Sequence, residues 1–130
     1  MKKGEDSDLS DKMVIYREQY ADLPARFVKK IDHDLEYLAD REIPGLQKVY
    51  LFGSCARGEV RSTSDVDLLV VTREKLQDRM LAADIRWTLD EEIDGVRTDI
   101  VYGNLRTAEE GTTFQRELKR DRKLVMEAVK

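Results

Sequence analysis

The chain has 130 residues, a formal net charge of -4 and 38% charged residues of both signs, a composition typical of one soluble domain. The acidic balance argues against binding nucleic acid through a broad basic surface, so no direct nucleic-acid contact is expected. One cysteine excludes an intrachain disulfide, and no apolar run reaches the ~20 residues that cross a bilayer. The charged start lacks an apolar signal segment and is not read as a secretory signal, so the expected compartment is the cytoplasm and no membrane partner is expected.

The front of the chain predicts two helices. Residues 1–10 are polar and are expected to be flexible, and Pro24 suits the first turn of the second helix. The apolar stripes are Met13, Tyr16, Tyr20 and Leu23 for the first helix, and Phe27, Ile31, Leu35 and Leu38 for the second. Pro44-Gly45 ends the second helix. We therefore expect N-terminal helices over 11–44.

The middle of the chain predicts two buried strands joined by a compact connection. Both apolar runs, residues 49–52 and 66–71, are rich in residues that favour strands. Residues 53–58 turn out of the first strand, with room for one helical turn, and residues 59–64 form a polar loop.

The second half alternates again between helix and strand. After a cap at Thr72, a helix is predicted with the apolar stripe Leu76, Met80, Ala83 and Trp87, which would bury Trp87 in the core. A strand at 96–102 follows the turn at Asp94-Gly95. The pattern Thr107-x-x-Glu110 predicts a last helix with Phe114 and Leu118 on one face, and residues 123–126 predict an edge strand. The expected fold class is α/β, a small mixed sheet with helices packed on it, in one domain over 11–130 with its core at 48–126.

The most informative motif is Gly53-Ser54, ten residues, then Asp65-Val66-Asp67. Residues two apart in a strand point to the same side, so the two carboxylates would project together, about 7 Å apart. Carboxylates that close repel each other unless a cation lies between them, and Mg²⁺ prefers carboxylate and phosphate oxygens. The Gly-Ser turn has free backbone N–H groups that suit phosphate. The pattern predicts a metal-dependent nucleotide site.

A third carboxylate would complete this site, and Asp99 is the best candidate because it lies within an apolar, strand-forming run. Its alternative role is a strand-edge charge facing water. Glu59 and Glu92 are weaker candidates, one in a loop and one at a helix end. An isolated Asp-x-Asp often only caps a turn, so the prediction depends on the whole pattern.

These residues resemble the signature of the nucleotidyltransferase superfamily that includes DNA polymerase beta. The string over 51–71 is similar to the smallest members, the minimal nucleotidyltransferases, and the resemblance covers about residues 48–126. It implies a polymerase-beta-like fold, from which the N-terminal helical extension is a departure. It also implies that Asp65, Asp67 and Asp99 are catalytic and bind Mg²⁺, as two ions, with Mn²⁺ as an alternative. Gly53 and Ser54 would hold the nucleotide phosphates, together with Ser64 in the same matched string.

The resemblance further implies a reaction and a partner. A nucleoside monophosphate, in the first instance AMP from ATP, would pass to a hydroxyl acceptor. Minimal nucleotidyltransferases are often antitoxins paired with a HEPN-type ribonuclease toxin, and some adenylylate a tyrosine of that toxin. The alternatives are a small-molecule, antibiotic-type nucleotidyltransferase and a non-catalytic antitoxin that binds its partner. A homo-oligomer is left open.

Several nearby residues allow two readings. Arg57 suits a phosphate, or a salt bridge to Glu59 or Asp65. Cys55 suits a small packed side chain better than a thiol nucleophile. His33 is read as a solvated helix residue. The basic residues Arg116, Lys119, Arg120, Arg122 and Lys123 are read as a solvated face.

Overall fold

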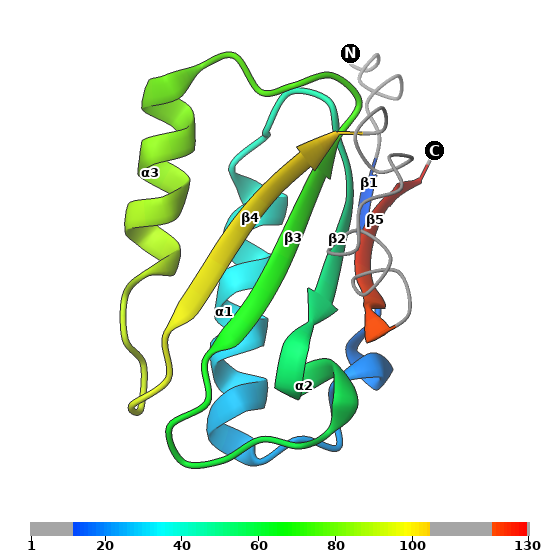
Figure 1. Ribbon diagram of the computed structural model, residues 1–130. Helices are drawn as coiled ribbons and strands as arrows, with labels where there is room; N and C mark the ends of the chain where they lie inside the picture. Colours follow the sequence, from blue (N-terminus) through cyan, green and yellow to red (C-terminus); the bar gives the residue numbers. More distant parts are fainter. Residues whose placement is uncertain (1–11, 105–120, 130) are drawn as a thin grey trace.

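The computed structural model describes residues 12–104 and 121–129. Its centre is a five-stranded sheet in the order β1-β5-β2-β3-β4 (Figure 1). The elements are β1 Lys12–Ile15, the 3-10 turn η1 Arg17–Gln19, α1 Ala25–Asp40, β2 Leu46–Phe52, α2 Gly53–Arg57, β3 Val66–Thr72, α3 Arg79–Leu89, β4 Thr98–Asn104 and β5 Lys123–Val129. Only β3 and β4 pair in parallel, so the sheet is mixed and the predicted α/β class is confirmed.

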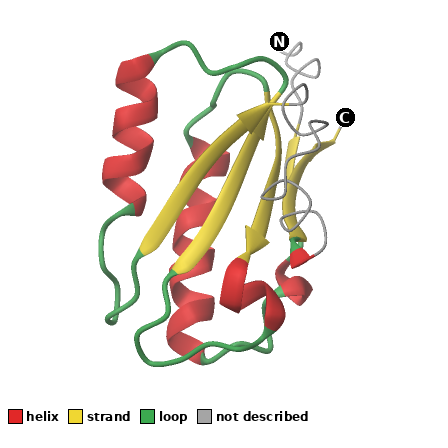
Figure 2. Ribbon diagram, in the orientation of Figure 1, coloured by secondary structure: helices red, strands yellow, loops and turns green. Residues whose placement is uncertain are grey.

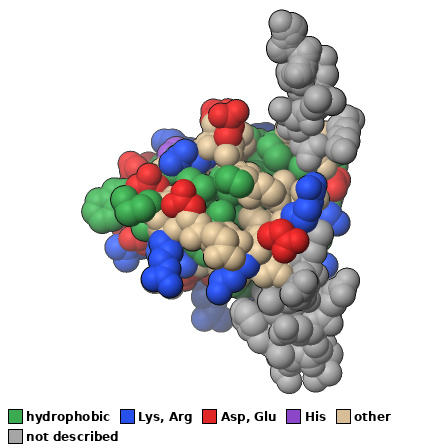
Figure 3. Space-filling model, turned by 90° about the horizontal axis from the view of Figure 1, so that it is seen from above, with side chains coloured by type: hydrophobic (Ala, Val, Ile, Leu, Met, Phe, Trp, Pro, Cys, Tyr) green, Lys and Arg blue, Asp and Glu red, His purple; other side chains and the backbone are tan. Residues whose placement is uncertain are grey.

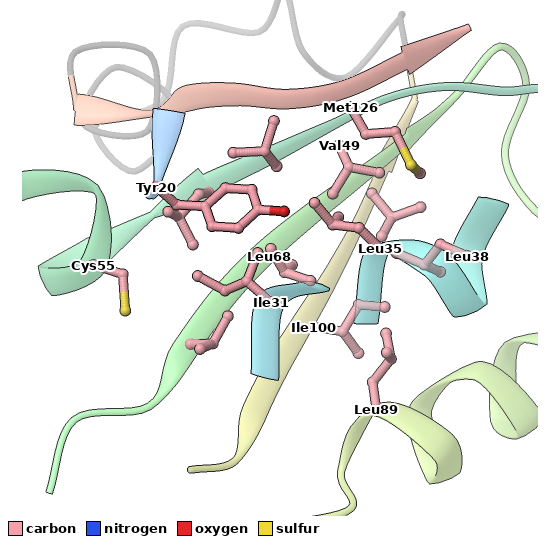
Figure 4. Close-up of a cluster of buried hydrophobic side chains, with 14 of the residues drawn as sticks. Tyr20, Ile31, Leu35, Leu38, Val49, Cys55, Leu68, Leu89, Ile100 and Met126 are labelled. Carbon is pink, nitrogen blue, oxygen red and sulfur yellow. The ribbon is translucent and has the colours of Figure 1, made fainter. Parts of the chain in front are cut away.

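The long helices α1 and α3 lie on one face of the sheet (Figure 2). The stripe predicted for α1 is confirmed, because Phe27, Ile31, Leu35 and Leu38 are all buried. Figure 4 shows Ile31 and Leu35 pointing toward Val49, Leu68 and Met126 of the sheet. Helix α1 therefore shares its hydrophobic core with the strands and does not extend away from it.

The predicted first helix is wrong. Residues 12–15 form strand β1, which pairs antiparallel with β5, and Met13 lies opposite Ala128. The backbone hydrogen bonds that stabilise this strand come from residues more than a hundred positions later, and they outweigh the local helical spacing. An edge strand was expected at 123–126, but strand β5 lies inside the sheet, between β1 and β2.

The helix predicted after Thr72 is also placed differently. It begins at Arg79, where the Asp78 side chain accepts a 3.0 Å hydrogen bond from the backbone N–H of Leu81. Its buried residues are Leu81, Ile85 and Leu89, whereas Met80, Ala83 and Trp87 of the predicted stripe are exposed. Leu76, the first residue of that stripe, lies before the helix and is partly buried against the core. Two apolar stripes run along this helix, and periodicity alone cannot decide which one meets the sheet.

The remaining elements agree more closely. Strand β4 covers 98–104, two residues later than predicted, because Val96 instead closes a small bridge with Ile93. The helix predicted around 107–118 lies outside the described residues. Within 12–104 and 121–129, no helix has the length and apolar character needed to cross a membrane.

Candidate active site

Asp67 and Asp99 lie side by side on neighbouring strands. The parallel register of β3 and β4 pairs Val66 with Thr98 and Asp67 with Asp99. Side chains alternate along a strand, and Leu68 points into the core beneath the helices. Asp67 and Asp99 therefore project from the opposite face of the sheet, at the end where β3 begins.

Electrostatics place Asp65 in the same group. The pKa of Asp67 is raised to about 6, first by its burial and then by the negative charges of Asp99 and Asp65. The positive charge of Arg57 acts in the opposite direction. The charges of Asp99 and Asp65 thus both act on Asp67 at this end of the sheet, and Arg57 is close enough to oppose them.

Gly53 lies directly against Asp67. It begins α2 with a φ of +72°, and a Cβ built on it would lie 2.3 Å from Asp67 Oδ2. Only glycine fits both the left-handed backbone and the close approach. The antiparallel pairing of Phe52 with Asp67 fixes this arrangement. The structure therefore brings the Gly-Ser turn and the Asp-x-Asp motif together, with Ser54 next to Gly53 in α2.

Arg57 makes the salt bridge that was one of its two predicted roles. Its Nε donates a 2.9 Å hydrogen bond to Glu59 Oε1, and its guanidinium lies 3.7 Å from Asp121 Oδ2. The bridge to Glu59 is exposed to solvent, so exchanging it for a phosphate costs little.

Ser64 closes the turn that leads into the motif. Its hydroxyl oxygen accepts a 2.8 Å hydrogen bond from the backbone N–H of Arg61, and its own N–H donates to the Arg61 carbonyl at 3.0 Å. In this arrangement Ser64 positions the residues before β3.

Cys55 is a packing residue, as its residue type and surroundings suggested. It is buried, and its thiol donates a long 3.6 Å hydrogen bond to the carbonyl of Asp65. Burial raises the pKa of the thiol to about 12, with a further contribution from Asp67. Because the thiolate is the nucleophilic form, this cysteine is unreactive at neutral pH.

A buried polar network behind β4 was missed by the sequence reasoning. Lys30 and Asp34 are fully buried, and Lys30 Nζ donates 2.8 Å hydrogen bonds to Asp34 Oδ1 and to the carbonyl of Leu89. The Thr98 hydroxyl donates to Asp34 Oδ2. Burial raises the pKa of Asp34, and the charge of Lys30 opposes that shift. The available signal was the position of Lys30 and Asp34, four residues apart on the apolar face of α1.

The carboxylates fit a divalent cation that is bound together with phosphate. Within the described residues, no three His, Cys, Asp or Glu side chains close around a metal ion by themselves. Mg²⁺ is usually held by one or two carboxylates plus substrate phosphates rather than by an all-protein cage. Burial contributes most to the raised pKa of Asp67, and the repulsion by Asp99 and Asp65 that adds to it is the kind that a bound cation relieves.

Comparison with known proteins gives a family match and several similar solved structures. The family model for the nucleotidyltransferase domain matches residues 27–127. Comparison with curated proteins gives no match. A toxin-antitoxin structure with AMP-PNP is 28% identical, with a TM-score of 0.52 over 74% of this chain and 69% of that chain. A putative nucleotidyltransferase from Sulfolobus solfataricus is 25% identical, with a TM-score of 0.54 over 77% of this chain and 79% of that chain.

A further solved structure, a mutant of the toxin-antitoxin pair MntA-HpeT, is 26% identical, with a TM-score of 0.51 over 72% of this chain and 70% of that chain. The family match runs from α1 into β5 and includes Gly53, Asp67 and Asp99. On this match and the shared fold, the chain belongs to the nucleotidyltransferase domain family.

Proposed function

We propose that this chain is a metal-dependent nucleotidyltransferase that transfers AMP from ATP to a hydroxyl group of a partner protein, in an antitoxin role. The observation that carries the proposal is the pairing of Asp67 with Asp99 directly beside Gly53. This arrangement puts acidic ligands next to a backbone that a phosphate can approach closely.

Each residue has a distinct role in the proposal. Asp65, Asp67 and Asp99 would hold Mg²⁺, with two ions expected and Mn²⁺ as an alternative, and the bound cation would supply charge neutralisation at the phosphate oxygens. Gly53 and Ser54 would receive the β- and γ-phosphates. Arg57 would exchange its exposed bridge to Glu59 for a phosphate oxygen.

The reaction is a displacement at the α-phosphorus. The acceptor hydroxyl oxygen forms a bond to that phosphorus, the bond to the bridging oxygen of the β-phosphate breaks, and pyrophosphate leaves. The hydroxyl proton passes to Asp99, whose exposed side chain is open to an incoming acceptor. Catalysis of this kind depends mainly on positioning and charge, which a small domain can provide.

The proposed acceptor is a tyrosine of a HEPN-type toxin. Support comes from two of the similar solved structures, a toxin-antitoxin structure with AMP-PNP and a mutant of the toxin-antitoxin pair MntA-HpeT. A partner of that kind acts inside the cell, so the proposal places this chain in the cytoplasm.

The test is mass spectrometry of the protein encoded beside this gene, after co-expression with this chain. Transfer adds about 329 Da, one AMP residue, to the neighbour, and Asp67→Asn abolishes the addition because a metal ligand is lost. Asp40→Asn, an exposed carboxylate at the end of α1, is the matched control and keeps the addition. An unmodified neighbour, with AMP transferred instead to an aminoglycoside, would identify a small-molecule enzyme. An unmodified neighbour that still binds the chain would identify a non-catalytic antitoxin.

A further inference from the structure

The outer face of α3 carries an apolar stripe that the fold does not use. Among the described residues, the exposed large hydrophobic side chains are Met80 and Trp87, at 81% and 83%. Ala83 is exposed between them, and the three positions follow one side of the helix. In Figure 3, hydrophobic side chains gather in a bulge at the edge of the molecule where α3 lies. We call Met80, Ala83 and Trp87 the outer stripe.

The helix that carries the outer stripe is firmly held. On its opposite side Leu81, Ile85 and Leu89 are buried against the sheet. The hydroxyl of Tyr102 in β4 also donates a 2.8 Å hydrogen bond to the carbonyl of Ala82. The stripe is therefore presented by a rigid element, which lowers the entropy lost when a partner binds. Exposed tryptophan on a rigid helix is typical of the centre of a protein interface.

The two edges of the outer stripe carry opposite charges. Arg79 and Arg86, seven residues apart, follow one edge, and the Arg86 guanidinium lies 5.7 Å from the centre of the Tyr102 ring. Asp84 follows the other edge and pairs with Arg41 at 3.5 Å. Asp90 lies beyond the last helical residue, on the arginine side. The basic edge favours acidic side chains on whatever covers the stripe.

A second copy of the same helix fits this surface poorly. In an antiparallel pair related by a twofold axis, the Arg79–Arg86 edge of one copy lies along the same edge of the other. Like charges placed in this way repel. The charge pattern thus favours a different polypeptide.

We propose that the outer stripe of α3 is the docking surface for an amphipathic helix of the toxin partner. The apolar face of that helix covers Met80, Ala83 and Trp87, and its acidic residues face Arg79 and Arg86. This inference rests on the proposed function, which supplies the partner. Helix α3 lies beside β4, the edge strand that carries Asp99. Asp99 projects from the face of the sheet opposite α3, so a partner held along α3 reaches the proposed base around the β4 edge of the sheet.

The chain contains one tryptophan, so fluorescence reports this surface directly. The probe is the protein encoded beside this gene, with any tryptophan of its own replaced by phenylalanine. On mixing, the emission of Trp87 shifts to shorter wavelength and acrylamide quenches it less, because the indole leaves water. An emission unchanged in a complex that forms would place the interface elsewhere.

Substitutions give the second measurement. Trp87→Ser weakens binding of the neighbour at least about tenfold, and Trp87→Phe weakens it less. Arg79→Glu also weakens binding, whereas the matched charge reversal Lys75→Glu, at a position outside α3, leaves the affinity unchanged. The Trp87→Ser chain still gains thermal stability from ATP with Mg²⁺, so a failure of docking is separable from a failure of the nucleotide site. Unchanged affinity in both Trp87→Ser and Arg79→Glu, or no binding of the neighbour at all, overturns the proposal. So does a homodimer of the chain that Trp87→Ser dissociates.

Discussion

Thr98 donates a hydrogen bond to the buried carboxylate of Asp34, and the residue after Thr98 is the site carboxylate Asp99. The interior of α1 is thus connected to the first residues of β4. Through that contact, a polar network on the helix-covered face of the sheet holds the strand whose opposite face carries the site.

Removal of the Thr98 hydroxyl tests this connection. Thr98→Val leaves Asp34 without one of its partners and lowers the free energy of unfolding by about 1–3 kcal/mol, whereas Thr98→Ser keeps the hydroxyl and loses less. Urea unfolding measures both changes. If the hydroxyl also positions Asp99, the valine variant loses kcat for AMP transfer while its KM for ATP changes little. Equal stability and equal kcat in the two variants would contradict the connection.

The buried pair of Lys30 and Asp34 predicts a non-additive result. Lys30→Met strands the Asp34 charge in the interior and lowers the free energy of unfolding by about 3–5 kcal/mol. In the double variant with Asp34→Leu that charge is gone, so it recovers part of the loss. Denaturant unfolding of the single and double variants decides the point. A double variant less stable than Lys30→Met would show that repulsion of an unpaired charge is not the main effect.

The raised pKa of Asp67 predicts that the stability of the fold without metal falls as pH rises. Its pKa in the folded chain is about 6, above the ordinary value of 3.8, so the folded state holds the proton more tightly. The stability this contributes is complete below about pH 4 and is lost as pH rises through about 6. At pH 7 without metal, Asp67→Asn should therefore be more stable than the wild type by roughly 1–2 kcal/mol, allowing for the partial exposure of the group.

Thermal unfolding of both proteins from pH 4 to pH 7, with chelator present, measures this difference. The gap should open with rising pH and close again when Mg²⁺ and ATP are added, since only the wild type binds them well. A gap that is constant with pH would argue against the carboxylate cluster.

Substitutions at two glycines distinguish backbone strain from a steric contact with Asp67. Gly53 and Gly58 both have a φ of +72°, but a Cβ would meet Asp67 only at Gly53, and nothing lies within 4 Å at Gly58. Alanine at either position carries a backbone strain of about 1–2 kcal/mol. Gly53→Ala should in addition abolish ATP binding, whereas Gly58→Ala should retain it. Isothermal titration with ATP and Mg²⁺ measures the affinities. Equal binding by both variants would contradict the close approach of a phosphate to the backbone at Gly53.

Local patterns predicted the parts of the fold that local interactions determine. The stripe of α1, the turn at Gly53 and the strand after Asp65 depend on residues close in sequence, and the structure has all three. Strand β1 was mistaken for helix because its partner β5 is distant in sequence. The outer stripe of α3 was mistaken for core because Met80 and Trp87 have the same periodicity as the buried Leu81 and Ile85.

In the candidate site, too, the features that depend on neighbouring residues were predicted, and those that depend on distant residues were not. The Asp-x-Asp spacing could be read from the sequence, but the pairing of Asp67 with Asp99 depends on the parallel register of two strands separated by a helix. Lys30 and Asp34 were passed over because charged residues on a helix are usually solvated, and only the packed structure shows that these two are buried.

The central claim is that these carboxylates transfer AMP, and labelled ATP tests it most directly. The chain is incubated with Mg²⁺ and its neighbour's product, once with ATP labelled at the α-phosphate and once with ATP labelled at the γ-phosphate. The account predicts protein-bound label from α-labelled ATP only, abolished by Asp65→Asn, Asp67→Asn or Asp99→Asn. Label from the γ-phosphate, or α-label that survives in the Asp67→Asn chain, would contradict it.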